Sequence, residues 1–185
     1  MVTIRPYAEK DKPLVQNLCL ANAGIGEASE EMQRFILNMY CNYYIEQEPE
    51  NCFVAVDEDD CAVGYIFCSE NCDVYEQKFN ELYIPNALEL GTKFYLDSKL
   101  DIITHTMFRT TYPAHLHIDI DAEYQGKGIG SALLDTLQHH LLGKGISSVM
   151  LVCGADNEGA IRFYKRNGYV TLITTHLGTA MGKEF

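Results

Sequence analysis

Hydrophobic residues recur along the chain with two periods, and the changes of period divide it into predicted strands and helices. Alternation, or short apolar runs bounded by turn residues, predicts strands at 3–7, 51–57, 61–69, 115–120, 147–153, 169–175 and about 179–183. Spacings of three and four predict helices over about 10–23, 29–43, 127–144 and 157–167. The strand–helix–strand–helix run from 115 onward requires a right-handed crossover between parallel strands. With hairpins on either side, the pattern predicts an α+β fold with a mixed sheet.

The segment between residues 70 and 112 has weak periodicity, and two helices are expected in it, at about 74–81 and 88–100. A segment of this length without clear secondary structure inside a compact domain is usually functional, or its helices and strands have been wrongly assigned. We therefore predict one domain over 1–185, with 70–112 as an insertion that lines a binding site. Its aromatic residues are the candidates for that lining, and plain core packing is the alternative for Tyr75, Phe79, Tyr83, Phe94 and Tyr95.

The composition narrows the class of protein. The chain has 185 residues, of which 47% are hydrophobic and 22% charged, as in a single globular domain. No apolar run approaches the roughly 20 residues that cross a bilayer, and the first residues lack a basic-then-apolar leader. These features predict a cytoplasmic protein. Seven cysteines, an odd number and scattered, predict reduced thiols; Cys68 and Cys72 have no second pair or nearby histidine, so no metal is expected.

The negative charge is concentrated in one part of the chain. The net charge is −12, and residues 1–122 carry 21 acidic against eight basic side chains. Nucleic acid and anionic membrane surfaces attract Lys and Arg, so both are excluded as partners. The acidic part favours a cationic partner such as an amine, with plain solubility as the alternative.

A glycine-rich turn precedes the predicted helix at 127–144. Glycines let the backbone approach a ligand closely, and the helix amino terminus adds a partial positive charge. The turn therefore predicts a cradle for an anion such as pyrophosphate, and a purely structural turn is the alternative. The spacing differs from the dinucleotide fingerprint and from the P-loop, which disfavours a dinucleotide-binding domain. The residues concerned are Gln125, Gly126, Lys127, Gly128, Ile129, Gly130 and Ser131.

The strand at 115–120 places three titratable side chains on one face. Because strand side chains alternate, His115, His117 and Asp119 share one face, and Leu116, Ile118 and Ile120 the other. Such a group supplies a base that takes a proton from an ammonium, directly or through water. An imidazole suits that task at its ordinary pKa of about 6.5, whereas a carboxyl with a pKa near 3.9 needs adjustment. A hydrogen-bonded polar patch is the alternative.

Two motifs carry a family resemblance. Residues Gln125–Gly130 fit Q/R-x-x-G-x-G/A, which resembles the acyl-CoA pyrophosphate loop of the GNAT superfamily of N-acetyltransferases. Residues Asn157–Tyr169 are similar to that superfamily's N-x-x-A-x-x-F-Y-x-x-x-G-F/Y run. The resemblance implies a mostly antiparallel central sheet flanked by helices, with a helical insertion before the central strand. The segment Tyr112–Ile120 is similar to the acetyltransferase-like domains associated with O-GlcNAcases, some of which have lost catalysis.

The resemblance also implies residue roles. Tyr164 becomes the acid that protonates the departing CoA thiolate, and Asn157, seven residues earlier on the same helix face, a CoA contact. Asp119 ranks before His117 as the base. The cofactor would then lie along the backbone of Ile118–Ile120 and against the loop from Gln125 to Ser131. His105, His139, His140 and His176 are expected to be structural or exposed.

The function implied is transfer of acetyl from acetyl-CoA, as co-substrate, to an amine by direct attack in a ternary complex. The acceptor is a small molecule or a peptide. A non-catalytic acetyl-CoA-binding module is the alternative. A homodimer is left open, since dimers are common in the superfamily.

Overall fold

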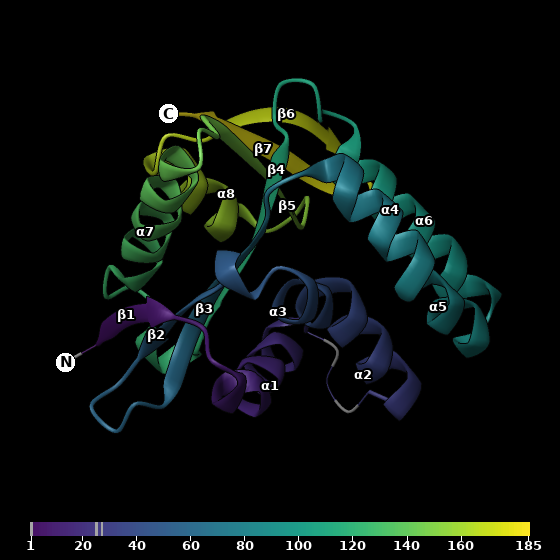
Figure 1. The fold of residues 1–185 in the computed structure, drawn as a ribbon, viewed down its shortest axis with the longest axis horizontal. Coiled ribbons are helices and arrows are strands. Elements are labelled where there is room, and N and C mark those ends of the chain that lie inside the picture. Colours follow the sequence, from purple (N-terminus) through teal and green to yellow (C-terminus); the bar gives the residue numbers. More distant parts are fainter. Residues whose placement is uncertain (1, 25, 27) are drawn as a thin grey trace.

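The computed structural model describes residues 2–24, 26 and 28–185. Its centre is one seven-stranded sheet in the order β1-β2-β3-β4-β5-β7-β6, with helices on both faces (Figure 1). Neighbouring strands are antiparallel except β4 and β5, which are parallel. This confirms the predicted fold class. The strands are β1 (Thr3–Pro6), β2 (Phe53–Val56), β3 (Ala62–Ser69), β4 (Ala114–Ile120), β5 (Ser148–Cys153), β6 (Val170–Thr175) and β7 (Gly178–Glu184).

The helices follow the predicted positions except in two places. They are α1 (Lys12–Asn22), α2 (Glu30–Leu37), α3 (Tyr43–Gln47), α4 (Cys72–Leu82), α5 (Ile84–Leu90), α6 (Thr92–Thr106), α7 (Ile129–Gly143) and α8 (Glu158–Arg166). The helix expected over 29–43 begins as predicted, because the Ser29 hydroxyl accepts a hydrogen bond from the Met32 amide. It is interrupted by a π-helical turn, Asn38–Asn42, which separates α2 from α3.

The insertion was predicted to hold two helices, and that was wrong. It holds three, α4 to α6, because the chain breaks where the second helix was expected to continue. Gly91 has a φ of +135°, which lies outside the helical region and which L side chains rarely adopt. Pro85 lies in the first turn of α5, where its missing amide removes no hydrogen bond.

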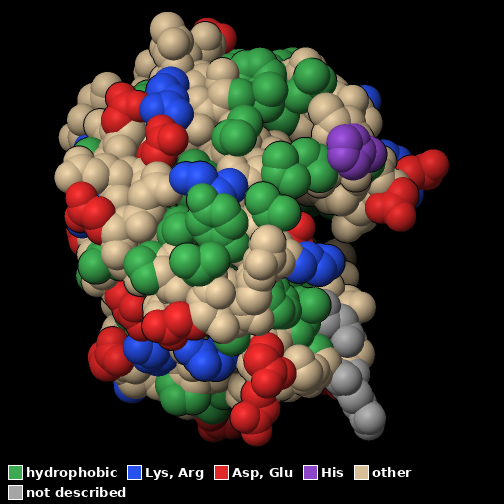
Figure 2. Space-filling view, turned by 90° about the vertical axis from the view of Figure 1, so that its right-hand side faces the viewer, with side chains coloured by type: hydrophobic (Ala, Val, Ile, Leu, Met, Phe, Trp, Pro, Cys, Tyr) green, Lys and Arg blue, Asp and Glu red, His purple; other side chains and the backbone are tan. Residues whose placement is uncertain are grey.

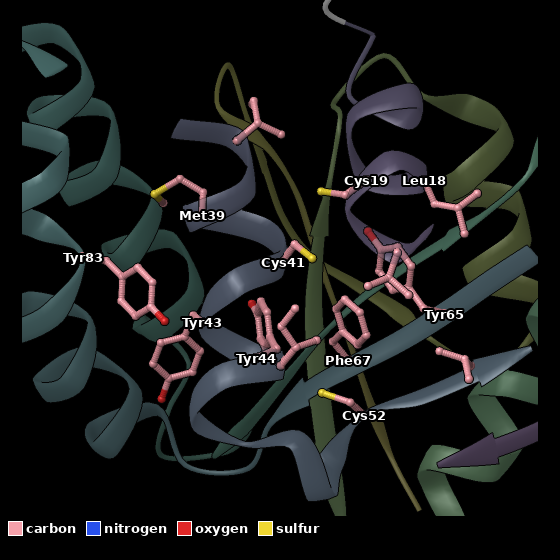
Figure 3. Close-up of a cluster of buried hydrophobic side chains, with 14 of the residues drawn as sticks. Leu18, Cys19, Met39, Cys41, Tyr43, Tyr44, Cys52, Tyr65, Phe67 and Tyr83 are labelled. Atoms are coloured by element: carbon pink, nitrogen blue, oxygen red, sulfur yellow. The ribbon is translucent and has the colours of Figure 1, made fainter. Parts of the chain in front are cut away.

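Two hydrophobic clusters cover the two faces of the sheet. Strand β3 is buried along its whole length and contributes to both: Tyr65 and Phe67 face the helices α1 to α6, whereas Ile66 and Cys68 face α7 and α8. Figure 3 shows the first cluster, with Tyr83 of α4's end beside Tyr43. The insertion aromatics Tyr75, Phe79 and Tyr83 are buried in this cluster and Phe94 packs against it, so for these four residues core packing is correct.

Strands β4 and β5 separate soon after they begin. Among the described residues, they pair only at Ala114 with Val149 and at His115 with Met150. Beyond that point β4 continues along β3 to Ile120, while β5 continues along β7 to Cys153. The backbone edge of β4 that faces β5 is therefore open over its second half.

The outer surface of the insertion is partly apolar. Figure 2 shows hydrophobic side chains on the face that α4 to α6 turn outward. On one stripe of α6 and its end, four hydrophobic side chains are each more than 40% exposed: Leu96, Leu100, Ile103 and Met107. A homodimer remains a prediction. Within the part of the chain that the structure describes, no helix has the length and apolar character needed to cross a bilayer.

Candidate active site

A cleft of about 1050 Å³ opens where β4 and β5 separate. Its walls come from α1 and the π-helical turn on one side and from the glycine loop and α8 on the other. Most of the predicted site residues line it, namely His117, Ile118, Asp119, Ile120, Gln125, Gly126, Gly128, Gly130, Ser131, Asn157 and Tyr164. Lys127 and Ile129 do not line this cleft; they line a smaller hollow of about 420 Å³ beside β1.

The glycine loop has the backbone that a close ligand approach requires. Gly126 and Gly128 adopt φ values of +73° and +83°, and Gly128 is the amino-terminal cap of α7. No side chain within the described residues caps the first turn of α7, so its amides are available to an anion. The Gln125 side chain donates to the Ile120 carbonyl oxygen at 3.0 Å, which ties the loop to the end of β4.

Gly130 is required by packing. A Cβ atom at this position would lie 2.9 Å from Cζ of Phe163 on α8. We therefore expect Gly130→Val to force α7 and α8 apart at a cost of about 1–3 kcal/mol and to lower the Tm by several degrees, measured by thermal unfolding. Gly143→Ala is the control, because a Cβ there meets nothing within 4 Å. A Gly130→Val protein with the wild-type Tm would contradict the prediction.

Helix α8 presents its two predicted site residues to the cleft. Asn157 caps the helix, since its Oδ1 accepts from the Ala160 amide at 3.0 Å, and this leaves its Nδ2 for a ligand. Tyr164, about two turns later, is buried. Burial raises the pKa of the Tyr164 phenol above its ordinary value, and the nearby Cys153 and Asp119 groups raise it further. The phenol therefore keeps its proton at neutral pH.

The three titratable residues of β4 lie on one face, as predicted, but only two reach the cleft. His115 is fully buried against Tyr75, with ring centroids 4.4 Å apart. Burial, followed by the neighbouring His105 and His117, lowers the pKa of His115 well below its ordinary value, so it is a neutral core residue. His117 and Asp119 line the cleft with side chains 28% and 16% exposed.

Asp119 is held by two donors and keeps one oxygen open. The Tyr65 hydroxyl, directly across the β3–β4 ladder, donates to Asp119 Oδ2 at 2.5 Å, and His117 Nε2 lies 3.1 Å from the same oxygen. Within the described residues, no side chain forms a hydrogen bond with the second carboxylate oxygen, Oδ1. Burial would lower the pKa of His117, but the Asp119 carboxylate outweighs it and raises the pKa to about 10. His117 and Asp119 thus form an ion pair.

The family is decided by a match over most of the chain. The model of the acetyltransferase (GNAT) family matches residues 21–169. The chain belongs to the GNAT acetyltransferase family. The cleft lies where its two sequence motifs, the glycine loop and the start of α8, meet.

Individual relatives agree with this assignment. N-alpha-acetyltransferase 30 of Schizosaccharomyces pombe is 25% identical over 169 residues, or 91% of this chain and 84% of that protein. Mycothiol acetyltransferase of Mycobacteroides abscessus is 37% identical over 57 residues, which span 31% of this chain and only 19% of that protein. The crystal structure of SsHAT matches with a TM-score of 0.86 at 24% identity and covers 99% of this chain and 98% of its own. A PaiA N-acetyltransferase from Thermoplasma acidophilum with coenzyme A matches with a TM-score of 0.63 at 17% identity, over 100% of this chain and 99% of its own.

Sequence reasoning missed the far end of this GNAT cleft. Tyr40, from the π-helical turn, stacks on His117 with centroids 5.4 Å apart, and its hydroxyl donates to Asp101 Oδ1 at 3.1 Å. His105 was expected to be structural or exposed; it is buried, lies 3.1 Å from Asp101 Oδ2 and lines the cleft. Burial lowers the pKa of His105, but Asp101 offsets this and leaves it above the ordinary value. The four-residue spacing of Asp101 and His105 is the signal that was available.

Proposed function

We propose that the protein transfers the acetyl group of acetyl-CoA to an amine by direct attack of that amine in a ternary complex. The observation that carries the proposal is the convergence of three features in one cleft. These are the open backbone edge of β4, the uncapped amino terminus of α7, and the side chains Asp119 and Tyr164. Asp119 and Tyr164 approach from opposite faces of the sheet, at the place where it opens.

The donor occupies the part of the cleft between the open strand and the loop. The pantetheine arm of acetyl-CoA extends along β4 as an added strand would, bonding to the backbone of Ile118–Ile120. The pyrophosphate binds the amides of residues 126–131, where the helix amino terminus favours negative charge. Asn157 Nδ2 donates to the pantetheine arm from the other wall.

The chemistry follows from the placement of the two titratable groups. Asp119 Oδ1 takes a proton from the incoming ammonium, directly or through water, and the amine then attacks the thioester carbon. The β4 amides stabilise the oxyanion that forms. When the carbon–sulfur bond breaks, Tyr164 gives its proton to the CoA thiolate, and the second proton that the nitrogen loses on becoming an amide passes through water to restore the phenol. Tyr65 and His117 act as positioning residues, since both hold Asp119 Oδ2.

The acceptor is a small-molecule or peptide amine that enters from the end lined by α1, the π-helical turn and α6. Tyr40, Asp101 and His105 would contact the part of the acceptor that does not react. We also propose that, within the family, the chain is related to the acetyltransferase-like domains associated with O-GlcNAcases. The strand segment Tyr112–Ile120 and the three-helix insertion before it support that kinship.

Acceptor-dependent thiol release tests the proposal. Acetyl-CoA and a panel of amines and amino-terminal peptides are incubated with the protein, and free CoA is measured with a thiol reagent. We expect release that depends on one class of amine, and no acetyl adduct on the protein by intact-mass spectrometry. An adduct on Cys19 or Cys153, both in the cleft, would contradict direct attack. Tight acetyl-CoA binding without release on any amine would favour the non-catalytic binding module.

Two substitutions of Asn157 distinguish its role as the cap of α8 from its proposed contact with acetyl-CoA. We expect Asn157→Asp to keep the Tm, since Asp caps helices as well as Asn, but to weaken acetyl-CoA about 2–10-fold by losing one donor. Asn157→Ala should lose both, with a lower Tm as well. Calorimetric titration and thermal unfolding measure the two effects. Unchanged acetyl-CoA affinity in Asn157→Asp would show that the amide makes no cofactor contact.

A further inference from the structure

Three potential metal ligands meet at the acceptor end of the cleft. They are the Cys19 thiol on α1 and the His117 ring and Asp119 carboxylate on β4, and one ligand atom from each lies within 4.8 Å of the other two. The sequence predicted no metal, because only Cys68 and Cys72 had a suitable local spacing. Here the three ligands come from positions about a hundred residues apart that the packing of α1 on β4 brings together.

We propose that this group binds a zinc ion, and that zinc bound there inhibits acetyl transfer. Thiolate, neutral imidazole and carboxylate are all zinc ligands, so zinc binding here releases the protons of the Cys19 thiol and the His117 ring. Three protein ligands with one open position are typical of catalytic zinc sites, where water holds the fourth position. The thiolate selects zinc over magnesium and calcium, which prefer oxygen ligands. Zn²⁺ with one thiolate and one carboxylate has no net charge, which lowers the cost of holding the ion in a half-buried cleft.

The geometry needs only a small adjustment. Bond lengths of 2.0–2.3 Å at a tetrahedral zinc place its ligand atoms roughly 3.5 Å apart. His117 Nε2 and Asp119 Oδ2 are already 3.1 Å apart, so about 1 Å of side-chain movement brings the thiol into place. Figure 3 shows Cys19 on α1 and the Tyr65 phenol turned toward the same region.

Neighbouring side chains supply an outer shell. The Tyr65 hydroxyl bonds to the carboxylate of Asp119, and the Tyr40 ring stacks on His117 and fixes its plane. Such contacts typically change metal affinity by 10–100-fold. Zinc at this position would occupy Asp119, the group proposed to receive the acceptor's proton, while leaving the glycine loop open. Bound zinc would therefore block proton transfer from the acceptor amine, but it would not block the binding of acetyl-CoA.

Zinc binding is measured first, on untagged protein and without turnover, by competition with a chromophoric chelator. We expect one tight site, an affinity lowered more than about a hundredfold in Cys19→Ala, and 10–100-fold in Tyr65→Phe. Cys153→Ala, which removes the other cleft cysteine, should keep the wild-type affinity. Mg²⁺ should not compete. Equal zinc affinity in Cys19→Ala and the wild type, or no wild-type binding below about 100 µM, would overturn the proposal.

Cobalt gives an independent readout. Co²⁺ should produce a thiolate-to-metal charge-transfer band that Cys153→Ala keeps and Cys19→Ser loses; a band that survives in Cys19→Ser overturns the site. Cys19→Ser also replaces Cys19→Ala if the latter does not fold.

Inhibition rests on the proposed function and is tested last: zinc should block amine-dependent CoA release, a chelator should restore it, and acetyl-CoA binding should be unchanged. If no amine is acetylated, the proposed function fails while the binding measurements still decide the site.

Discussion

Replacing Tyr164 by phenylalanine is expected to lower kcat by about 100-fold or more and to leave acetyl-CoA affinity within about threefold of the wild type. A positioned proton donor contributes typically 10²–10⁴-fold to a rate. The phenol, which we propose as the proton donor, is buried beside Cys153 at the end of β5, and burial keeps it protonated. Phenylalanine preserves the ring packing against Phe163 and Tyr169, so the fold should be unaffected.

Single-turnover rates and calorimetry, measured on the same preparations, check this result. Tyr169→Phe is the matched control, because it removes a neighbouring phenol from the same cluster and should retain most of the turnover. If Tyr164→Phe retains full turnover, the thiolate leaves without a proton from Tyr164. An equal loss of turnover in both variants would point to packing instead of acid catalysis.

Replacing Asp119 by asparagine is expected to lower kcat by about 100-fold or more, again with acetyl-CoA affinity preserved. Asparagine keeps the shape and still accepts the Tyr65 hydrogen bond, but it takes no proton from the acceptor. Removing the basic carboxylate of a residue that acts only in proton transfer lowers kcat more than it raises the KM for the amine. Steady-state kinetics with saturating acetyl-CoA give both constants.

Asp121→Asn is the control for Asp119→Asn. Asp121 lies two residues along the chain, caps the 3-10 turn that follows β4, and asparagine caps equally well. Its kinetics should match the wild type. A raised KM with unchanged kcat in Asp119→Asn would make Asp119 an acceptor-binding group only, and the base would have to be sought elsewhere in the cleft.

The half of the cleft that we propose binds the donor was predictable as a structure, because its sequence signals are local. The glycines of 125–130 and the run from Asn157 to Tyr169 each lie within one strand–helix unit, so spacing alone places them on a loop and a helix face. The alternation along β4 likewise predicted that His117 and Asp119 share a face. The alternation does not report how deeply each side chain is buried. It therefore did not predict that His115 is buried against Tyr75 while His117 reaches the cleft.

The half of the cleft that we propose for the acceptor depends on contacts between distant segments. Tyr40 enters the cleft through a π-helical turn, which a helical period of 3.6 does not anticipate. Cys19 meets His117 only because α1 packs on β4. In the insertion, the aromatic residues were predicted to line a binding site, but they fill the core around Tyr43. The polar pair Asp101 and His105 reaches the cleft instead.

The most direct test of the central claim is a calorimetric titration with acetyl-CoA, with desulfo-CoA and NAD as comparison ligands. We predict one site with micromolar affinity for acetyl-CoA, similar affinity for desulfo-CoA, and no heat with NAD. Absence of acetyl-CoA binding to folded protein, or equal binding of NAD, would mean that the glycine loop is only a turn and that the cleft between β4 and β5 is not a coenzyme A site.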